Sequence, residues 1–381
     1  MRTTTRIPFN RPYRTGDEAA AIAAAIEAGW TGGNGPQSRR CEELLAELTG
    51  ARRVLMTPSC TGALEMAALL ADVGPGDEVV MPSFTFVSTA NAFVLRGATP
   101  VFVDVDADTL NIDPRRAADA VNARTRALVA VHYGGVGCDM EALGALARAH
   151  DLLLVEDAAQ GIGASRGGQA LGAIGGLGTL SFHETKNVSC GEGGALLVND
   201  ERLAARAEIL QEKGTDRRRF DRGEVDQYTW IDVGSSFLMS DITAAVLADQ
   251  LERVAQITAA RMAIWDAYHA AFEPLERAGL LRRPVVPAGA QHNAHLYRLQ
   301  LADRATRDAL IAALAATGVS AYFHYVPLHS APAGLRHARV HGPMDVTEDA
   351  AGRLVRLPLW VGLTEDDVAR IAAEVARALG A

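Results

Sequence analysis

Short apolar runs alternate with helical patterns between about residues 54 and 200. The strand candidates are Val54–Met56, Glu78–Met81, Val101–Val105, Ala127–Val131, Leu152–Glu156, Thr179–Phe182 and Ala195–Val198. Between the first five lie stretches with helical spacing, at Thr61–Ala71, Val87–Leu95, Pro114–Val121 and Met140–Ala149. Runs that are apolar throughout are typical of parallel strands covered on both faces. The pattern predicts an α/β fold with a mainly parallel, seven-stranded sheet between two layers of helices.

The pattern changes after residue 200. Long helical stretches at Leu203–Glu212 and Asp241–Phe272 are followed by a proline-bounded segment, Pro274–Pro287. Beyond it we expect a strand at His295–Leu301, a helix at Ala305–Ala316, a strand at Ser320–Tyr325 and a final helix at Glu365–Leu379. A chain of 381 residues exceeds one typical hydrophobic core. We therefore predict a large domain over residues 1–260 and a smaller C-terminal α/β domain over residues 261–381.

Composition narrows the possible functions. Hydrophobic residues make up 49% and charged residues 22%, as in an ordinary globular enzyme. A net charge of −9 argues against a nucleic-acid or membrane-surface partner. The sequence has neither an apolar run of about 18 residues nor a signal peptide, so we expect a cytoplasmic protein. Its four cysteines show no metal-ligand spacing, and no metal site is expected.

Two polar side chains follow apolar strands where a ligand crevice is expected. Asp157 ends the run from Leu152, and Lys186 comes shortly after the run that ends at Phe182. The carboxyl ends of strands face the crevice in open α/β sheets. Pyridoxal 5′-phosphate (PLP) chemistry needs a lysine that forms a Schiff base with the cofactor aldehyde and a carboxylate that keeps the pyridine nitrogen protonated. Taken separately, the aspartate is better explained as a helix cap or turn residue and the lysine as a solvated surface residue.

A third element strengthens the first two. The apolar run Val54–Met56 leads into a Ser/Thr/Gly turn, Ser59–Gly62, which opens a helix. The first amides of a helix have no internal partners and carry partial positive charge, so this turn suits a phosphate. Alone, it would be explained by an ordinary cap from Ser59 or Thr61.

The sequence resembles the DegT/DnrJ/EryC1/StrS aminotransferases, PLP enzymes of fold type I that aminate keto sugars carried on nucleotides. The ordered motifs that carry this resemblance are Ser59-Cys60-Thr61, Pro82–Phe86, Glu156–Gln160, Ser181-Phe182-His183-x-x-Lys186 and Gly191–Gly194. Within the family, the likeness is closest to the dTDP-4-amino-4,6-dideoxygalactose transaminases. It runs through Phe84–Asn91, Glu212–Thr215, Ser235–Asp241 and Phe323–His329.

The resemblance implies a role for each matching residue. Lys186 would bind the cofactor aldehyde and Asp157 its pyridine nitrogen, with Gln160 near the phenolic oxygen and Phe86 stacked on the ring. Ser59, Cys60, Thr61, Gly62 and Ser181 would surround the phosphate. Ser236 stands where many members have an asparagine that reaches the neighbouring subunit's cofactor, and Leu238 replaces an arginine. The serine has a shorter reach, and the favoured subgroup shares both changes.

The implied reaction moves the amino group of glutamate to C4 of a dTDP-4-keto-6-deoxyhexose, in a homodimer whose active site lies at the interface. Lys213, Tyr228 and His329 are the candidates for contact with the nucleotide sugar. His329 fits a hydrogen-bonded structural histidine equally well. The alternative is amination of a 3-keto nucleotide sugar by the same residues.

Other activities fit less well. Sugar dehydratases on this fold carry histidine in place of Lys186, and a non-catalytic protein would not need Asp157 and Lys186 intact. No arginine stands in a motif known to bind an α-carboxylate, which argues against a general amino-acid aminotransferase.

Overall fold

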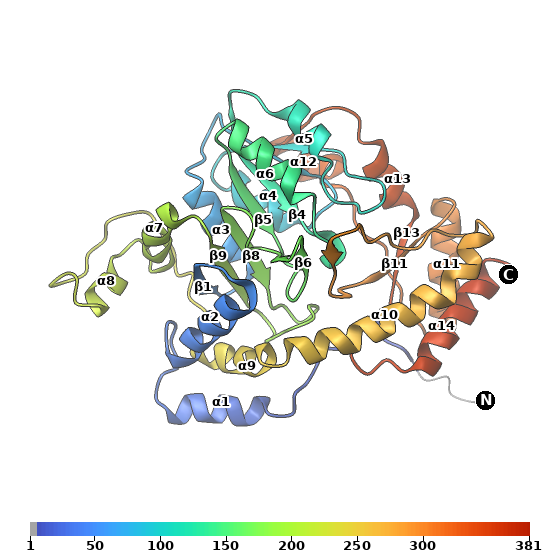
Figure 1. Ribbon diagram of the computed structural model, residues 1–381, viewed down its shortest axis with the longest axis horizontal. Coiled ribbons are helices and arrows are strands. Elements are labelled where there is room, and N and C mark those ends of the chain that lie inside the picture. The colour runs from blue at the N-terminus through green and yellow to red at the C-terminus, as the bar shows by residue number, and fades with distance from the viewer. Residues whose placement is uncertain (1–5) are drawn as a thin grey trace.

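The computed structural model describes residues 6–381 and is built around one large sheet (Figure 1). Its eight strands are, from edge to edge, β1 (Arg53–Thr57), β9 (Gly194–Val198), β8 (Leu177–Ser181), β5 (Leu153–Asp157), β4 (Thr125–Val131), β2 (Glu78–Pro82), β3 (Thr99–Val103) and β12 (Arg339–Val340). β9 runs antiparallel to both neighbours, and the other adjacent pairs are parallel. The predicted mainly parallel α/β sheet is confirmed. The pattern did not indicate the eighth strand, which has two residues.

Helices cover both faces of the sheet because its inner strands are apolar on both sides. In β2, Val79 and Met81 face a core formed with α3 (Cys60–Leu70), α4 (Val87–Val94) and α7 (Glu201–Gln211). Val80 points to the opposite face, where α5 (Pro114–Ala120) and α6 (Met140–Ala149) pack. On that face the β1 end is covered by α2 (Pro36–Thr49) and α9 (Asp241–Leu251), and α1 (Glu18–Glu27) packs on α9.

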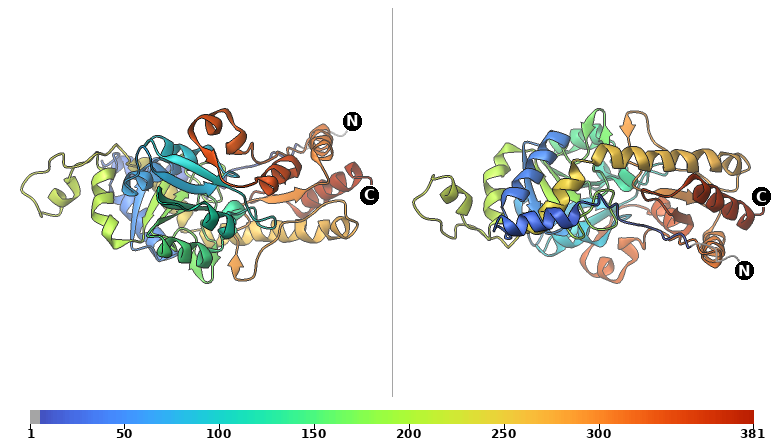
Figure 2. Two further views of the ribbon diagram at one scale, coloured as in Figure 1. Left: turned by 90° about the horizontal axis from the view of Figure 1, so that it is seen from above. Right: turned by 90° about the horizontal axis from the view of Figure 1, so that it is seen from below.

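The C-terminal part has a separate core. α10 (Val254–Arg277) runs from the large sheet towards the end of the molecule where the C-terminus lies (Figures 1 and 2). It packs there with α11 (Arg304–Ala316), α14 (Glu365–Ala378) and an antiparallel pair of strands, β11 (Tyr297–Gln300) and β13 (Leu354–Leu357). Tyr268, Phe272 and Tyr297 are fully buried in this core. α13 (Asp345–Arg353) precedes β13.

Three sequence expectations meet a different structure. The strand expected at Ser320–Tyr325 is wrong, because only Tyr322 there forms a single bridge, to Arg356 in β13. The helical pattern Asp241–Phe272 is two helices, which separate around Glu252 and Arg253. The division at residue 260 falls inside α10 and stays a prediction.

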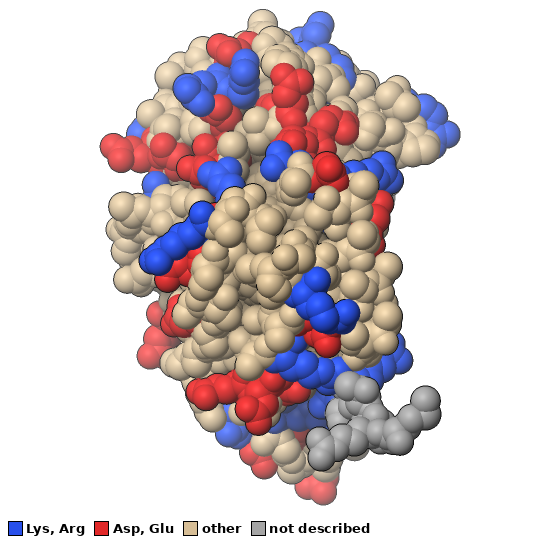
Figure 3. Space-filling view, turned by 90° about the vertical axis from the view of Figure 1, so that its right-hand side faces the viewer, with Lys and Arg blue, Asp and Glu red and all other residues tan. Residues whose placement is uncertain are grey.

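The remaining elements are short. They are β6 (Ser165–Arg166), β7 (Gln169–Ala170), β10 (Ala290–Gln291), α8 (Arg217–Asp221), α12 (Pro332–His337) and two 3-10 turns (Tyr133–Gly135 and Leu328–Ser330). The segment around α8 projects away from the body at one end (Figure 1). On the face shown in Figure 3, acidic and basic side chains are interspersed around an uncharged centre. No helix in residues 6–381 is long and apolar enough to cross a membrane.

Candidate active site

A cavity of about 550 Å³ lies at the carboxyl ends of the central strands. Residues that follow β1, β2, β5 and β8 form its floor, which is the crevice position expected for an open α/β sheet. The C-terminal part of the chain forms another wall, through His295, Tyr322, His324, Tyr325 and Arg356, and Phe9 and Asn10 also line the cavity. The cavity therefore lies between the two cores.

Lys186 lies in the loop from β8 to β9 and lines this cavity. Its backbone amide donates to the His183 carbonyl at 2.9 Å, which fixes the loop. The side chain is partly buried, and its amino group has no ion pair or hydrogen bond with any described residue. Burial lowers the pKa of Lys186 below that of a solvated lysine, although the nearby Cys60 and Asp157 oppose the shift. The amine is thus more readily deprotonated than a surface lysine.

Asp157 ends β5 and is 5% exposed at the cavity floor. Its Oδ2 accepts a 2.6 Å hydrogen bond from the Thr89 hydroxyl, and its Oδ1 accepts one of 3.2 Å from the Ala159 amide. The Thr89 hydroxyl in turn contacts that of Thr85 at 2.8 Å. Because donors hold both oxygens, the carboxylate is fixed in orientation.

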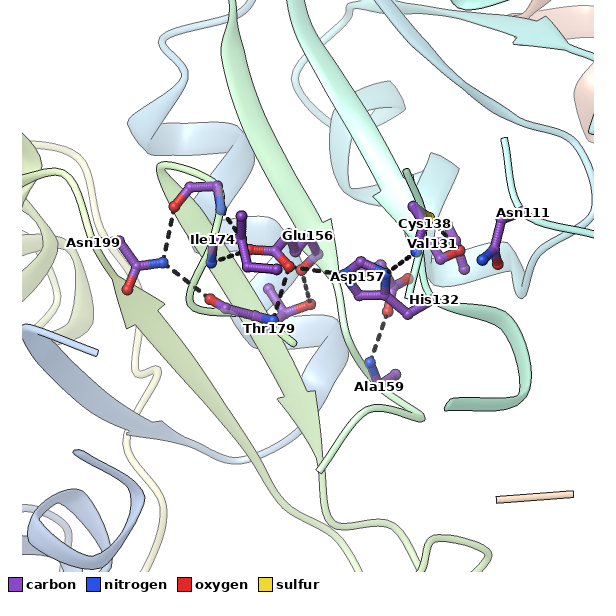
Figure 4. A network of polar contacts seen from close by, with 12 residues as sticks. Asn111, Val131, His132, Cys138, Glu156, Asp157, Ala159, Ile174, Thr179 and Asn199 are labelled. Carbon is purple, nitrogen blue, oxygen red and sulfur yellow. Dashed lines mark hydrogen bonds and ion pairs between the residues drawn. The ribbon is translucent and has the colours of Figure 1, made fainter. Parts of the chain in front are cut away.

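A buried network lies directly behind Asp157 (Figure 4). Glu156, the preceding residue, is fully buried and accepts hydrogen bonds from the amides of Gly172, Ile174 and Gly175 at 2.5–2.9 Å. It also contacts His132 Nε2 at 2.8 Å. His132 Nδ1 accepts from the Cys138 amide at 3.1 Å, so the imidazole proton is on Nε2 and is donated to Glu156. This network holds the end of β5 in place.

The start of α3 also lines the cavity. Ser59 caps the helix, since its hydroxyl accepts from the Gly62 amide at 3.0 Å. Thr61 and Ser88 bring their hydroxyls within 2.8 Å of each other and both line the cavity. A side chain at Gly194 would collide with the backbone of Ser59 and Cys60, so β9 lies directly against the helix start. Hydroxyls gathered at a helix N-terminus suit a phosphate group.

Comparison with known proteins agrees with this arrangement. Residues 12–376 match the model of the DegT/DnrJ/EryC1/StrS aminotransferase family. The chain belongs to this family. The aminotransferase TlmJ from Streptoalloteichus hindustanus is similar over 99% of each chain, with 34% identity and a TM-score of 0.90. DesV from S. venezuelae, solved in complex with a ketimine intermediate, has 31% identity over 99% of this chain and 100% of its own, with a TM-score of 0.89.

Spr1654 from Streptococcus pneumoniae, a proposed sugar aminotransferase, was solved in a PLP-form. It is 25% identical over 99% of each chain, with a TM-score of 0.89. The expectations of fold type I and of PLP as cofactor are confirmed, and this chain is a PLP-dependent aminotransferase.

The cavity fits this cofactor. It offers a lysine whose amino group has no partner in residues 6–381 for the aldehyde, a held carboxylate for the pyridine nitrogen, and hydroxyls at a helix start for the phosphate. Most of the residues expected to bind the cofactor line the cavity: Ser59, Cys60, Thr61, Phe86, Asp157, Gln160, Ser181 and Lys186. Gly62 lies behind this wall, with its amide already bonded to Ser59.

Phe86 and Gln160 differ in how firmly they are held. Phe86 is 60% exposed beside the cavity, so one face of its ring is open to a ligand. Gln160 is fixed at both ends of its amide, since its oxygen accepts from the Gly134 amide at 2.6 Å and its nitrogen donates to the Tyr325 hydroxyl at 3.2 Å. Tyr325 and Gln160 thus join the C-terminal wall to the cavity floor.

Ser236, Lys213 and Tyr228 do not line the cavity of their own chain. They belong to the segment between α7 and α9, where Ser236 bridges to Glu212 and Lys213 pairs with Glu212 at 3.1 Å. Tyr228 is 48% exposed, with the Arg217 guanidinium 5.0 Å from the centre of its ring. The segment is the one that projects from the body in Figure 1.

His329 also lies outside the cavity. Its ring contacts the Ser83 hydroxyl at 2.7 Å through Nδ1 and Glu348 at 2.9 Å through Nε2. The backbone amide of His329 donates to the same hydroxyl at 3.0 Å. These contacts join the loop after β2 to α13. They agree with the alternative that His329 is a hydrogen-bonded structural histidine.

Sequence reasoning missed several groups. Thr89 contacts Asp157 and His132 contacts Glu156 from other elements. Thr89 stands in the motif Phe84–Asn91 and His132 follows the apolar run Ala127–Val131, but neither position indicates its partner. Arg261 and Arg356 line the cavity from the C-terminal half. For Arg356 the available signal was a lone charge in the apolar run Leu354–Leu359.

Proposed function

We propose that this aminotransferase moves the amino group of glutamate to C4 of a dTDP-4-keto-6-deoxyhexose, which makes a dTDP-4-amino-4,6-dideoxyhexose. The observation that carries the proposal is that Lys186, whose amino group has no partner among residues 6–381, and Asp157 line one cavity between two cores. The choice of substrate is supported by the motif Phe323–His329, whose His324 and Tyr325 line that cavity. A sugar substrate is also supported by the likeness to Spr1654.

The cofactor would be held at three points. Asp157 would face its pyridine nitrogen, Thr61 and Ser181 its phosphate, and Lys186 its aldehyde. Bound PLP supplies an electron sink for the carbon that carries the transferred amine. Thr89 keeps the Asp157 carboxylate oriented so that a proton stays on the pyridine nitrogen.

Lys186 would move the proton during transfer. Its neutral amine would take the proton from the donor Cα, and in the second half of the reaction it would return a proton to the sugar carbon that receives the amine. The pKa lowered by burial gives this amine a larger neutral fraction at neutral pH, which a base requires. Asp157 would support both halves of the reaction because the same held carboxylate faces the cofactor in each.

The test is incubation of the purified enzyme with PLP, glutamate and dTDP-4-keto-6-deoxyglucose, with the product identified by NMR. A 4-amino-4,6-dideoxyhexose supports the proposal, and its H3–H4 coupling gives the configuration at C4. Failure to aminate this sugar by an enzyme that binds PLP and reacts with glutamate would overturn the C4 assignment. A 3-keto sugar nucleotide is the next substrate to assay.

We also propose that two copies form a homodimer and share their active sites. The segment that carries Lys213, Tyr228 and Ser236 projects from the body and exposes Trp230, Ile231 and Val233 by 76%, 46% and 55%. Such a group of apolar side chains is typical of a protein–protein interface. In a dimer, this segment would bring its polar residues to the partner's cavity.

Hybrid formation tests the shared site. Lys186→Ala and a double variant, Lys213→Ala with Tyr228→Ala, should each be nearly inactive alone. After mixing with subunit exchange, activity should return, because each hybrid has one intact site. No recovery in hybrids verified by mass spectrometry would contradict a shared site.

A further inference from the structure

Arg356 has an unusual environment among the cavity-lining groups. It lies in β13, in a run that is otherwise buried and apolar, and its side chain lines the cavity beside His324 and Tyr325. The guanidinium stacks over the Phe9 ring at 4.7 Å from the ring centre. One nitrogen, Nη2, donates to the Phe323 carbonyl at 3.2 Å. The side chain is therefore held against a wall of the cavity.

The hydrogen-bonding capacity of Arg356 is mostly unused. Its Nε is buried and has no hydrogen-bond partner, and no carboxylate in residues 6–381 forms an ion pair with its guanidinium. Tyr133 and Tyr325 lie close enough to influence the pKa of Arg356, but burial raises the pKa of both phenols, so they stay neutral and supply no counter-charge. Even partial burial of a cation without a counter-charge is costly, so such a group is typical of a site that receives an anion.

The other arginine that lines the cavity, Arg261, already donates hydrogen bonds to backbone carbonyls. Arg261 is 4% exposed, and it donates from Nε to the Ala294 carbonyl at 3.1 Å and from Nη2 to the His295 carbonyl at 2.8 Å. These bonds hold the chain before β11 against α10. Arg356 is thus the better candidate for a ligand.

We propose that Arg356 binds the α-carboxylate of the amino donor. The inference rests on the proposed function, in which an amino acid supplies the amine. A planar guanidinium presents parallel N–H donors that match a carboxylate in a bidentate pair, and such a pair fixes the donor as well as binding it. Fixed in this way, the Cα–H bond would be directed towards Lys186, the proton acceptor.

The position of Arg356 favours the donor carboxylate over the diphosphate of the nucleotide sugar. The positive charge of Arg356 is close enough to Lys186 to help lower the pKa of its amine. In an amino acid, the carboxylate and the amine are on the same carbon. In a nucleotide sugar, the diphosphate at C1 is separated from the reacting C4 by the sugar ring. An anion site close to Lys186 therefore suits the carboxylate of the amino donor.

Separate half-reactions test this assignment. The PLP enzyme is mixed with glutamate and the cofactor absorbance is followed in a stopped-flow instrument. The amine-loaded enzyme is then mixed with the keto sugar. In Arg356→Gln we expect the apparent dissociation constant for glutamate to rise about tenfold to a hundredfold, since a charge-assisted pair is lost. Arg356→Lys should recover part of this loss, and the sugar half-reaction should change less than threefold, as a rough bound.

A donor without an α-carboxylate distinguishes contact from a merely structural effect. 4-Aminobutyrate is glutamate without this group, so wild type should prefer glutamate strongly and Arg356→Gln should lose most of that preference. Binding of α-methylglutamate, which has no Cα proton to transfer, gives a second readout by calorimetry and should weaken by the same factor. Arg304→Gln is the matched control, because Arg304 is a surface residue 3.7 Å from Asp308.

Each outcome decides the assignment. If Arg356→Gln binds glutamate as wild type does but reacts poorly with the keto sugar, the arginine serves the diphosphate and the proposal is wrong. Equal loss with glutamate and 4-aminobutyrate would also overturn it. If the wild-type enzyme does not react with glutamate but does react with another L-amino acid, the donor in the proposed function is wrong. The Arg356 comparison is then made with that donor and its decarboxylated form.

Discussion

The Thr89 hydroxyl donates a 2.6 Å hydrogen bond to Asp157 and so connects α4 to the carboxyl end of β5. A hydroxyl has one proton, so the 2.8 Å contact between Thr89 and Thr85 must be donated by Thr85. The two threonines form a short chain of donors that ends on the carboxylate. The segment Thr85–Thr89, which is far from Asp157 in the sequence, thus orients its carboxylate.

Thr89→Val keeps the shape of the side chain and removes the donor. We expect the cofactor to bind more weakly and kcat to fall roughly tenfold, because a hydrogen bond to a buried charge is lost. Thr85→Val is the matched control, since it removes the bond to Thr89 and leaves the one to Asp157. Absorbance titration with PLP and steady-state kinetics measure both effects. Equal losses in the two variants would contradict a direct role for Thr89.

Lys186→Ala removes the proposed proton carrier. Turnover should fall by about 10³-fold or more, since general acid–base groups contribute up to about 10⁴-fold and the covalent link is lost as well. The absorbance band of PLP linked to the enzyme should also be absent. Unchanged circular dichroism would show that the loss is chemical. Turnover close to wild type would refute the assignment of Lys186.

Glu156→Gln should destabilise the fold. The new amide NH₂ would face backbone N–H groups of the loop Gly172–Gly175, which donate to Glu156 in the wild-type protein. We expect the free energy of unfolding to fall by about 3 kcal/mol, as when a buried charged network loses a member. Urea denaturation monitored by fluorescence measures this change. Glu141→Gln, at an exposed position on α6, should differ little from wild type.

Glu78 should make stability depend on acid pH. It is 3% exposed at the start of β2, and hydrogen bonds from Arg339, together with those from Asn122 and Arg124, lower its pKa to about 2. A carboxyl group with a lowered pKa stabilises the fold above its unfolded pKa, and this contribution is lost as the pH falls towards the folded value.

Glu78→Gln should therefore have a lower Tm than wild type at pH 7, and the difference should shrink as the pH falls from about 4.5 towards 2. Thermal unfolding followed by circular dichroism at several pH values gives the comparison. Because Arg339 lies in β12, the variant should also loosen the edge of the sheet next to β3. A difference in Tm that stays constant over this range would mean that Glu78 does not titrate as expected.

The central strands and the cofactor motifs could be predicted because both are local in sequence. Each strand of the large sheet except β12 is an apolar run, and Asp157, Ser181 and Ser59 follow such runs directly. Where an element depends on its partners, prediction was weaker. β12 has two residues and forms only against β3, and the polar residues near Tyr322 bend into the cavity wall instead of pairing as a strand.

By itself, the sequence determined the sheet, the family and the residues at the strand ends, because apolar periodicity and short motifs act over a few residues. Only the tertiary structure decided which distant groups complete the site. Arg356 reaches the cavity from a strand 170 positions after Lys186, and Thr89 and His132 approach Asp157 and Glu156 from neighbouring elements. Packing of the two cores brings these groups together, and no local pattern records a contact between residues so far apart in the chain.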